Sequence, residues 1–368
     1  MFSDTWDVDG VTNSIRRSKK GLEARGHEVL VFTAAPDDRQ GWVDGVYYFK
    51  GSRFPFYPSY RLCFKPEDIS KELKGVDVIH VHTPAFIGVK GMLASFRLKI
   101  PSVYTWHMDP LLGLETYIQF LPQSILKRLA KMYMNRFLKP FKAITFPSLD
   151  AKSHASWLQV PKAITRVFPT GIDLASFRYR DSSCLPLRLT EAIEDGKKII
   201  LTVGRIAKEK NMELIFEAMK EMDKDYVLFV VGKGPCYKEF KERYTSKRIM
   251  FLGWMSHPDS GISWDLPLVY ASADCFVIAS KAETQGMVVH EAMSMGLPVA
   301  ALNCEPMSEF VNDKCGRLFE EDTSSLSRAL IDIVKNHDSL SLGAIEVAKN
   351  NSLDRFIDSL EEVYNQVQ

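Results

Sequence analysis

Two carboxylates eight positions apart are the first residues whose types and spacing suggest chemistry. Glu283 and Glu291 lie in "KAETQGMVVHEAMSMGLPV", which spans residues 281–299. The pattern predicts a strand that ends before Glu283, a turn, and a helix that contains Glu291 and ends at Gly296. Both side chains can reach a ligand that lies across the start of this helix. Alternatively, Glu283 is a solvated loop residue and Glu291 a surface position on the helix.

The start of this helix is suited to a negatively charged ligand. The first N–H groups of a helix have no partner within it, and together with the positive end of the helix dipole they favour a phosphate. Here they belong to Gly286, Met287 and Val288. Because a phosphate repels a neighbouring carboxylate, we expect the two glutamates to accept hydrogen bonds from hydroxyl groups, such as those of a sugar.

A second set of charged residues follows a predicted strand in "LTVGRIAKEKN", residues 201–211. Gly204 ends the strand, and Arg205 and Lys210 lie in the loop before a helix that is predicted to begin near Asn211. Arginine binds a diphosphate through forked hydrogen bonds, and lysine binds it as a point charge. The pattern indicates a diphosphate-binding loop, and the alternative is a solvated basic loop.

Two glycine-containing segments give weaker signals. "VVGKGPCYKEF" has Gly232 and Gly234 after another predicted strand, but it lacks the G-x-G-x-x-G spacing of a dinucleotide site. In "DVDGVTNSI", Gly10 comes just before a predicted helix. The backbone could approach a phosphate there, or the glycine could simply form a turn.

Short β-rich runs alternate with helical patterns along the chain, and these elements must position the charged residues. The first set of strands is "HEVLVFTA", "GVDVIHVHTP", "IPSVYTWHM" and "KAITFPS"; the second is "GKKIILTVG", "DYVLFVVG", "KRIMFLGW", "ADCFVIAS" and "LPVAALN". Repeated β/α units predict an α/β protein with two Rossmann-like parallel sheets, each covered by helices. Because ligands bind beyond the carboxyl ends of such strands, we expect the two domains to face each other across a cleft.

The composition excludes several classes of protein. The chain has 368 residues, of which 46% are hydrophobic and 25% charged, with a net charge of +1. These values are not typical of a disordered chain or of a nucleic-acid binder. The acidic start "MFSDTWDVDG" is unlike a secretory signal, and no apolar run approaches the length of a spanning helix. Six scattered cysteines without a C-x-x-C pair indicate reduced packing residues in a cytoplasm.

Candidate metal ligands are few. Asp7 and Asp9 in "DVD" have the spacing of a metal-binding pair, but they adjoin the Gly10 loop. His80 and His82 in "IHVHTP" point to one face of a strand and have no third ligand nearby in the sequence, so strand-end packing is favoured over zinc. We therefore expect no metal site.

These segments together resemble the retaining GT-B glycosyltransferases of family 4, over nearly the whole chain. "GRIAKEKN" is similar to the family's Arg/Lys diphosphate loop, and "ETQGMVVHEAMSMGLPV" to its Glu-x7-Glu signature. "FSDTW", "GVTNSI", "RGHEV", "RFPFYPSYRL", "HVHTPAFIG", "FPSLDAKS" and "FPTGID" are similar to the branch that glycosylates diacylglycerol-type or phosphatidylinositol-type lipids. Family members usually carry several apolar residues before the "FSD" stretch, whereas Met1 directly precedes Phe2 here. Either the true start of the chain lies upstream, or the first sheet tolerates a short central strand.

The resemblance implies roles for the charged residues of the second half. Arg205 and Lys210, beside Gly204, hold the donor diphosphate. Glu283 accepts hydrogen bonds from hydroxyls of the transferred sugar, and Glu291 binds the ribose. The helix start at residues 286–288 completes the donor site.

Four further residues take roles only through the resemblance. His107 in "YTWHMD" faces the sugar, and Gly10 lies against the donor phosphates. Trp254 and Met255, after "MFLG", border the base. The candidate catalytic residues are therefore His107, Arg205, Lys210 and Glu283, while Asp109 is a candidate nucleophile only.

The resemblance also implies a domain organisation. Residues 1–172 form an N-terminal acceptor-binding domain and residues 173–350 a C-terminal donor-binding domain. The polar stretch "FPTGIDLASFRYRDSSCLP" is the linker. The last segment, residues 351–368, has helical spacing and is expected to cross back to the first domain.

The implied reaction is the transfer of a hexose, glucose in the first place, with retention of anomeric configuration. The donor is a nucleotide sugar such as UDP-glucose or GDP-mannose, and the acceptor is a membrane lipid such as diacylglycerol or glycosyl-diacylglycerol. As the bond between sugar and diphosphate breaks, Arg205, Lys210 and the helix N–H groups stabilise the growing negative charge, so neither a metal nor another cofactor is expected. The protein is expected in the cytoplasm, bound peripherally to the inner face of the cell membrane.

Three alternatives remain open at this point. The first is a GDP-mannose-dependent mannosyltransferase that acts on phosphatidylinositol or a soluble glycan. The second is an NAD(P)-linked oxidoreductase on paired Rossmann domains, which the missing G-x-G-x-x-G weakens. The third is a subunit that binds nucleotide sugar without activity.

A basic segment, residues 117–142, is the predicted contact with an anionic membrane. No acidic residue lies between Glu115 and Asp150. Apolar residues recur there at helical spacing, so the segment lies in the headgroup layer or packs on the first sheet with its basic face exposed, and a packed helix can still present its charges to anionic lipid. The basic residues are Lys127, Arg128, Lys131, Arg136, Lys139 and Lys142, the apolar residues are Leu126, Leu129, Tyr133 and Phe137, and the expected aromatic contacts near the acceptor's entry are Phe54, Phe56 and Tyr57.

Overall fold

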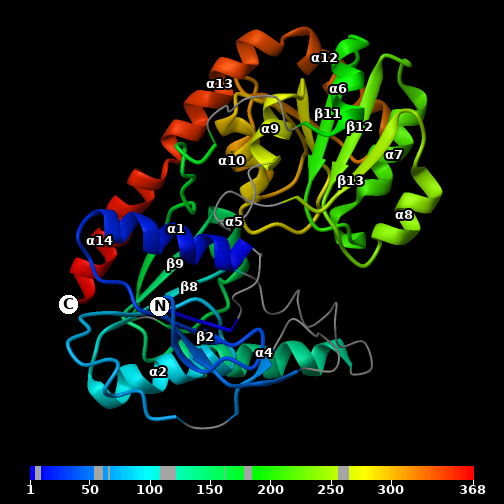
Figure 1. Ribbon diagram of the computed structural model, residues 1–368. Helices are drawn as coiled ribbons and strands as arrows, with labels where there is room; N and C mark the ends of the chain where they lie inside the picture. The colour runs from blue at the N-terminus through cyan, green and yellow to red at the C-terminus, as the bar shows by residue number, and fades with distance from the viewer. Residues whose placement is uncertain are drawn as a thin grey trace. The chain divides into compact units, whose positions relative to one another are not determined.

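The chain folds into two compact units, shown in the computed structural model of Figure 1. The N-terminal unit contains Met1–Gly171 and Leu353–Gln368, and the C-terminal unit contains Ile172–Ser352. The structure describes residues 1–4, 10–53, 61–64, 67–107, 122–160, 162–177, 185–255 and 265–368.

The N-terminal unit is built on an eight-stranded sheet with the order β10-β9-β8-β7-β1-β2-β4-β3. Its strands are β1 (Phe2–Ser3), β2 (Val31–Ala34), β3 (Gly41–Val43), β4 (Val46–Phe49), β7 (Ile79–Val81), β8 (Ser102–Thr105), β9 (Ala143–Phe146) and β10 (Ile164–Val167). A separate antiparallel pair is formed by β5 (Ser52–Arg53) and β6 (Arg61–Leu62). The helices are α1 (Gly10–Ala24), α2 (Phe86–Leu98), α4 (Gln123–Leu138), α5 (Leu149–His154) and α14 (Leu353–Val367).

The predicted parallel sheet is confirmed in this unit, with one antiparallel strand at its edge. Strand β3 runs antiparallel to β4. The two strands are joined by Asp44 and Gly45, which both have positive φ values, of 49° and 75°. An Asp-Gly pair in this conformation forms the two-residue turn that matches the twist of a hairpin, so the chain reverses here without a crossover helix.

The central strand β1 is short, with two residues, yet it pairs with both of its neighbours. Phe2 is in register with Phe32 of β2 and Val81 of β7. The Phe2 and Phe32 rings stack with centroids 4.7 Å apart. Helix α2 packs closely on this strand, because a Cβ atom at Gly91 would lie 2.7 Å from the Phe2 ring.

The C-terminal unit has a six-stranded, fully parallel sheet with the order β13-β12-β11-β14-β15-β16. Its strands are β11 (Lys198–Val203), β12 (Tyr226–Val231), β13 (Ile249–Gly253), β14 (Cys275–Ile278), β15 (Val299–Leu302) and β16 (Gly316–Phe319). The helices are α6 (Leu187–Glu194), the short 3-10 helix η2 (Lys208–Lys210), α7 (Met212–Glu221), α8 (Tyr237–Tyr244), α9 (Asp265–Ala271), α10 (Met287–Ser294), α11 (Met307–Phe310), α12 (Thr323–Lys335) and α13 (His337–Asn350).

The strands of the C-terminal unit are apolar on both faces because each face carries its own core. Leu201 and Phe229 belong to one buried cluster, whereas Ile200 and Leu228 belong to another. Alternate residues of a strand point to opposite faces, so runs such as "IILTV" are buried throughout. This explains why the sequence shows continuous apolar runs rather than alternation.

The last helix, α14, is part of the N-terminal unit and packs on α1. Ile357 and Leu360 share a buried cluster with Ile15 and Leu22. Arg25, the residue after α1, donates hydrogen bonds of 2.6 and 2.7 Å to the carboxylates of Asp358 and Glu361, respectively. Among the residues that the structure describes, none of the helices is both long enough and apolar enough to cross a membrane.

Candidate active site

The C-terminal sheet has a switch point between β11 and β14. From β11 the chain continues to β12 and β13 on one side, and it returns to β14 on the other side of β11. In open α/β sheets, ligands bind at such a point, beyond the carboxyl ends of the two strands. Arg205 follows β11 and Glu283 follows β14. The fold therefore brings both sequence motifs to the place where a ligand is expected.

An ion pair joins the two motifs directly. Lys210 Nζ lies 2.5 Å from Glu283 Oε1, and the two side chains are only 22% and 15% exposed. The loops also contact through their backbones, because the Lys281 N–H donates to the Glu209 carbonyl at 3.3 Å. Residues 73 positions apart thus form one charged cluster.

Arg205 has a carboxylate partner of its own. Its guanidinium pairs with Glu209, and about a third of each side chain is exposed. Partial burial raises the pKa of Glu209, but the Arg205 hydrogen bond and charge outweigh that effect and leave the pKa below its usual value. Arg205 and Lys210 are therefore each paired with a nearby carboxylate, and a diphosphate bound here would compete with or rearrange these pairs.

Glycines at the carboxyl ends of β11 and β12 allow the backbones to approach closely. A Cβ atom at Gly232 would lie 1.9 Å from the Gly204 carbonyl oxygen, and one at Gly234 would lie 2.3 Å from that of Ile206. The φ values of Gly204 and Gly232 are 154° and 135°. The G-x-G segment therefore has a packing role, which holds the Arg205 loop against β12.

Helix α10 begins at the switch point. Gly286 is its N-cap residue with φ of 72°, a left-handed conformation that favours glycine, and the first turn contains Met287 and Val288. A Cβ atom at Gly286 would lie 2.6 Å from the terminal methyl of Met307. The structure thus places the predicted phosphate-favouring N–H groups next to the Glu283 loop.

Glu291 is buried inside α10, with 3% of its surface exposed. It accepts a hydrogen bond of 3.2 Å from the Tyr270 hydroxyl. The alternative of a surface position for Glu291 is therefore wrong, because helix α10 turns this face towards the protein.

Trp254, 44% exposed, and Met255, half-buried, follow β13. Strand β13 lies two strands from β11, a separation of about 10 Å.

The N-terminal sheet has its own switch point, between β1 and β7. Asp4 follows β1 and Thr83 follows β7. The Asp4 carboxylate accepts hydrogen bonds from the Thr83 hydroxyl and, at 2.8 Å, from the Ile87 N–H in the first turn of α2. Gly10 is the first residue of α1. Asp4 is buried, and its hydrogen bonds hold the start of α2 in place. The sequence alone did not indicate this role, because the partners of Asp4 lie about 80 residues away.

A row of imidazole rings connects β7, β8 and α14. His80 contacts the Tyr364 hydroxyl at 2.7 Å and the Thr105 hydroxyl at 2.6 Å. The His80 and His82 rings stack with centroids 4.1 Å apart, and His82 Nδ1 lies 2.9 Å from His107 Nε2. His80 and His82 thus pack at the end of the strand, as predicted. His82 also contacts His107, and this contact depends on the pairing of β7 with β8.

Burial keeps these histidines neutral. It lowers the pKa of His107 to about 4, and the pKa values of His80 and His82 also fall well below the usual value. His107 can therefore donate or accept a hydrogen bond at neutral pH without carrying charge.

Within the described residues, no group of three or more His, Cys, Asp or Glu side chains could hold a metal ion. Asp7, Asp9 and Asp109 lie outside those residues.

Comparisons with known proteins cover both units. The model of the family described as "Glycosyltransferase Family 4" matches residues 8–176, and the model described as "Glycosyl transferases group 1" matches residues 197–336. An alpha-monoglucosyldiacylglycerol synthase of Streptococcus pneumoniae is 30% identical over 95% of this chain and 82% of its own length. The chain belongs to the family 4 glycosyltransferases.

Membership settles the class of reaction and the fold. This family 4 glycosyltransferase is a retaining hexosyltransferase with the GT-B fold. A GDP-mannose-dependent alpha-mannosyltransferase of Mycolicibacterium smegmatis is 30% identical over 80% of the chain and 76% of its own length. The solved structure of sucrose-phosphate synthase from Thermosynechococcus elongatus has a TM-score of 0.73 at 18% identity and covers 97% of this chain and 93% of that one. The oxidoreductase and inactive-subunit alternatives are wrong.

In this family 4 glycosyltransferase, the predicted apolar stripe of the basic segment is divided between core and surface. Leu126 and Phe137 of α4 are buried, whereas Leu129 and Tyr133 are 49% and 45% exposed. Helix α4 packs on the N-terminal unit through one side, so only part of the stripe faces outward. Phe54, Phe56 and Tyr57 lie outside the described residues.

The exposed face of α4 mixes basic and apolar side chains. Ile125, Leu129 and Met132 recur at helical spacing and are between 49% and 64% exposed. The exposed basic residues are Lys127, Arg128, Arg136 and Lys139, whereas Lys131 is half-buried with its ammonium 5.5 Å from the centre of the Trp157 ring.

Proposed function

We propose that the protein transfers glucose from a nucleotide sugar to a diacylglycerol-type membrane lipid. The ion pair between Lys210 and Glu283, at the switch point of the C-terminal sheet, carries this proposal. It brings the basic loop, the acidic loop and the start of α10 together, so one ligand with a diphosphate and sugar hydroxyls can contact all three. The similarity to a monoglucosyldiacylglycerol synthase supports glucose and diacylglycerol.

In the proposed mechanism, Arg205 and Lys210 bind the diphosphate, and the N–H groups at the start of α10 contact the same phosphates. Negative charge grows on the leaving diphosphate as the glycosidic bond breaks, and these preorganised groups stabilise it. Positive charge grows on the anomeric carbon, close to the Glu283 carboxylate, which also accepts hydrogen bonds from the sugar hydroxyls. Side chains and backbone N–H groups would thus stabilise the charge on the diphosphate without a metal ion. We therefore expect activity to survive treatment with EDTA.

The remaining residues are proposed to orient the donor and the sugar. Buried Glu291 would accept hydrogen bonds from the ribose, and Trp254 would border the base. The distance of about 10 Å between β13 and β11 is suited to a nucleotide that extends across two strands. His107 would contact the sugar from the N-terminal unit as a neutral imidazole, held in place by His82.

Ligand-induced thermal stabilisation tests the donor class. A ligand that binds only the folded state raises its stability by RT ln(1 + [L]/Kd), about 2.7 kcal/mol at a concentration of 100 Kd. We expect UDP to raise the melting temperature in a Lys210-dependent manner and NAD(H) to leave it unchanged. A transfer assay with UDP-glucose and diacylglycerol then tests the reaction, and absence of glucosyl-diacylglycerol in an assay with intact vesicles would contradict the proposal.

A second candidate is a GDP-mannose-dependent mannosyltransferase, because a relative of that name is also 30% identical. The same experiments separate the two. Stabilisation by GDP rather than UDP, together with mannose transfer to phosphatidylinositol or a soluble glycan, would favour the second candidate.

We also propose that the protein works at the inner face of the cell membrane as a peripheral enzyme. The mixed basic and apolar face of α4 supports this location, since such a face binds anionic headgroups and inserts apolar side chains between them. Each exposed basic residue close to the surface is expected to contribute about 1 kcal/mol.

A further inference from the structure

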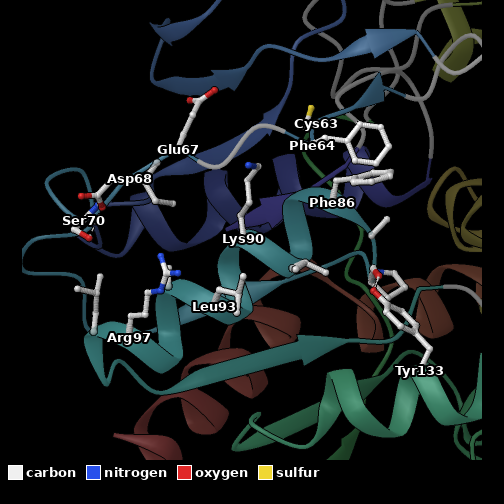
Figure 2. Close-up of a pocket in the computed structure, with 16 residues that line it drawn as sticks. Cys63, Phe64, Glu67, Asp68, Ser70, Phe86, Lys90, Leu93, Arg97 and Tyr133 are labelled. Atoms are coloured by element: carbon white, nitrogen blue, oxygen red, sulfur yellow. Dashed lines mark hydrogen bonds between the residues drawn. The ribbon is translucent and has the colours of Figure 1, made fainter.

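A groove of about 650 Å³ runs along helix α2 in the N-terminal unit (Figure 2). Its volume is within the range of roughly 300–1,000 Å³ that is typical of ligand pockets. Phe86, Lys90, Leu93 and Arg97 line it from α2. Their spacing of four, three and four residues places them on one face of the helix, so the groove is about 16 Å long.

The middle and one end of the groove are apolar. Figure 2 shows Phe64, Phe86 and Tyr133 gathered at that end, and the rings of Phe64 and Phe86 pack edge to face with centroids 4.7 Å apart. The Lys90 ammonium lies 5.1 Å from the centre of the Phe49 ring, which leaves the aliphatic stem of Lys90 along the groove. Phe64 is 70% exposed and Leu93 is 43% exposed. Covering this apolar surface is favourable.

The other end of the groove is basic. Arg97 lies there, next to a second pocket of about 420 Å³ that contains Lys71 and Lys74. Ser70 and Leu98 line both pockets, so the two adjoin. Two carboxylates also line the groove, and one of them, Asp68, lies at this end on the same side as Arg97. Asp68 accepts a hydrogen bond of 2.6 Å from the Ser70 hydroxyl, and Glu67 accepts one of 3.4 Å from Tyr47.

We propose that this groove binds one acyl chain of an anionic glycerophospholipid, with the phosphate at the Arg97 end and the chain directed towards Phe64 and Phe86. The three basic residues at the Arg97 end, Arg97, Lys71 and Lys74, complement the headgroup, and the apolar end complements the chain. The proposal goes beyond glycosyl transfer, because this lipid is a membrane component and not the acceptor.

The groove is less suited to a peptide. An extended peptide would bury backbone N–H and C=O groups that need partners. The groove wall is a helix, whose mid-helix backbone groups are already used within α2. An acyl chain has no polar groups and requires no such partners. Tyr133 belongs both to this groove and to α4, so a lipid in the groove would lie next to the exposed basic and apolar face of α4.

Binding of monomeric short-chain lipids to the full chain tests the proposal. Dioctanoylphosphatidylglycerol and dioctanoylphosphatidylcholine, both below their micelle concentrations, are titrated by calorimetry in the absence of donor and acceptor. We expect one phosphatidylglycerol per protein and about tenfold weaker binding of phosphatidylcholine. Octanoate measures the contribution of a free fatty acid, and binding as tight as that of phosphatidylglycerol would contradict a phospholipid ligand.

Three variants locate the binding site. Leu93→Asp places a charge in the groove and should weaken phosphatidylglycerol binding by about tenfold or more. Phe96→Asp is the matched control, because Phe96 lies on the same helix, is 73% exposed and does not line the groove. Arg97→Glu should remove the preference for phosphatidylglycerol over phosphatidylcholine.

Several results would overturn the proposal. They are the absence of saturable binding, unchanged affinity in folded Leu93→Asp, and a headgroup preference that persists in Arg97→Glu. Circular dichroism and the melting temperature establish that each variant is folded. Glucosyl transfer by the unsubstituted protein is measured separately. If the unsubstituted protein transfers glucose but binds no phosphatidylglycerol, the result counts against this proposal alone, and if it binds phosphatidylglycerol but transfers no glucose, the result counts against the proposed reaction alone.

Discussion

Arg205 and Lys210 are each paired with a carboxylate, and a bound diphosphate would compete with these carboxylates for the two cations. The Arg205 pair with Glu209 is local, whereas the Lys210 pair with Glu283 joins two loops. Both cations are about a third exposed or less, so water screens their charges only in part. Their proposed role in stabilising the leaving group can be tested one residue at a time.

Arg205→Ala removes the forked donor that is proposed to hold the leaving diphosphate. We expect kcat/KM to fall by about two powers of ten, or about 3 kcal/mol, because the lost interaction is strongest in the transition state. Lys208→Ala is the control, since Lys208 is an exposed cation of the same loop. Activity of folded Arg205→Ala within a few-fold of the unsubstituted protein would remove this role.

Glu283→Gln keeps the size of the side chain and one acceptor oxygen but removes the negative charge that is proposed to act near the anomeric carbon. We expect kcat to fall by about ten- to a hundredfold, while the donor Kd changes by only a few-fold. Exposed Glu321 supplies the matched control, Glu321→Gln. The decisive measurement is the donor Kd by calorimetry beside kcat. If Kd accounts for the whole loss in activity, Glu283 is a ground-state contact only.

At the scale of elements, the Arg205 loop depends on the close approach of β11 and β12. Gly232→Ala would force its Cβ atom to within 1.9 Å of the Gly204 carbonyl oxygen. We expect it to lower the free energy of unfolding of the C-terminal unit by about 3 kcal/mol or more. Gly196→Ala provides the comparison, because its φ is 63° and no atom lies within 4 Å of the added Cβ. That variant should cost about 1–2 kcal/mol, the backbone strain alone.

Helix α4 should bind anionic vesicles through its exposed basic face. Replacing Arg128, Arg136 and Lys139 by glutamate should weaken co-sedimentation with phosphatidylglycerol-containing vesicles by about a hundredfold or more, at about 1 kcal/mol for each basic residue. Binding by the unsubstituted protein should weaken with salt. A control variant carries glutamate at three exposed positions of the C-terminal unit, Lys224, Lys247 and Arg328. Equal, salt-insensitive binding by both variants would show that α4 is not the contact.

At the scale of the whole molecule, the row of histidines makes stability depend on pH. The folded pKa of His107 is about 4, below its usual value near 6.5. Between these values the unfolded chain binds the proton and the folded chain does not, so stability falls as pH decreases from about 6.5 to 4. His107 alone corresponds to a loss of about 3 kcal/mol at pH 4, and His80 and His82 act in the same direction.

The measurement is the denaturant stability of the N-terminal unit at several pH values between 7.5 and 4.5. His107→Gln should flatten the dependence in this window. An unaltered pH dependence in His107→Gln would show that His107 titrates in the folded state near its usual value.

Much of the fold follows from short-range pattern. Runs such as "IILTV" and "YVLFVV" are long and apolar enough to require burial on both faces, and they became β11 and β12. The signature around Glu283 and Glu291 places a strand, a turn and a helix in an order that allows few other arrangements. Asp44 and Gly45 also carried a hairpin signal, which is local and could have predicted the antiparallel edge.

Other features depended on residues that meet only after folding. The Lys210–Glu283 pair requires that β14 return beside β11, and the contact of His82 with His107 requires that β7 pair with β8. The periodicity of α4 is the same whether an apolar residue faces the core or the surface, so packing on the sheet decided that Phe137 is buried and Leu129 exposed. Residue types and spacing thus determined the elements and the chemistry available. Strand order and side-chain packing determined which groups meet, because those contacts join positions far apart in the chain.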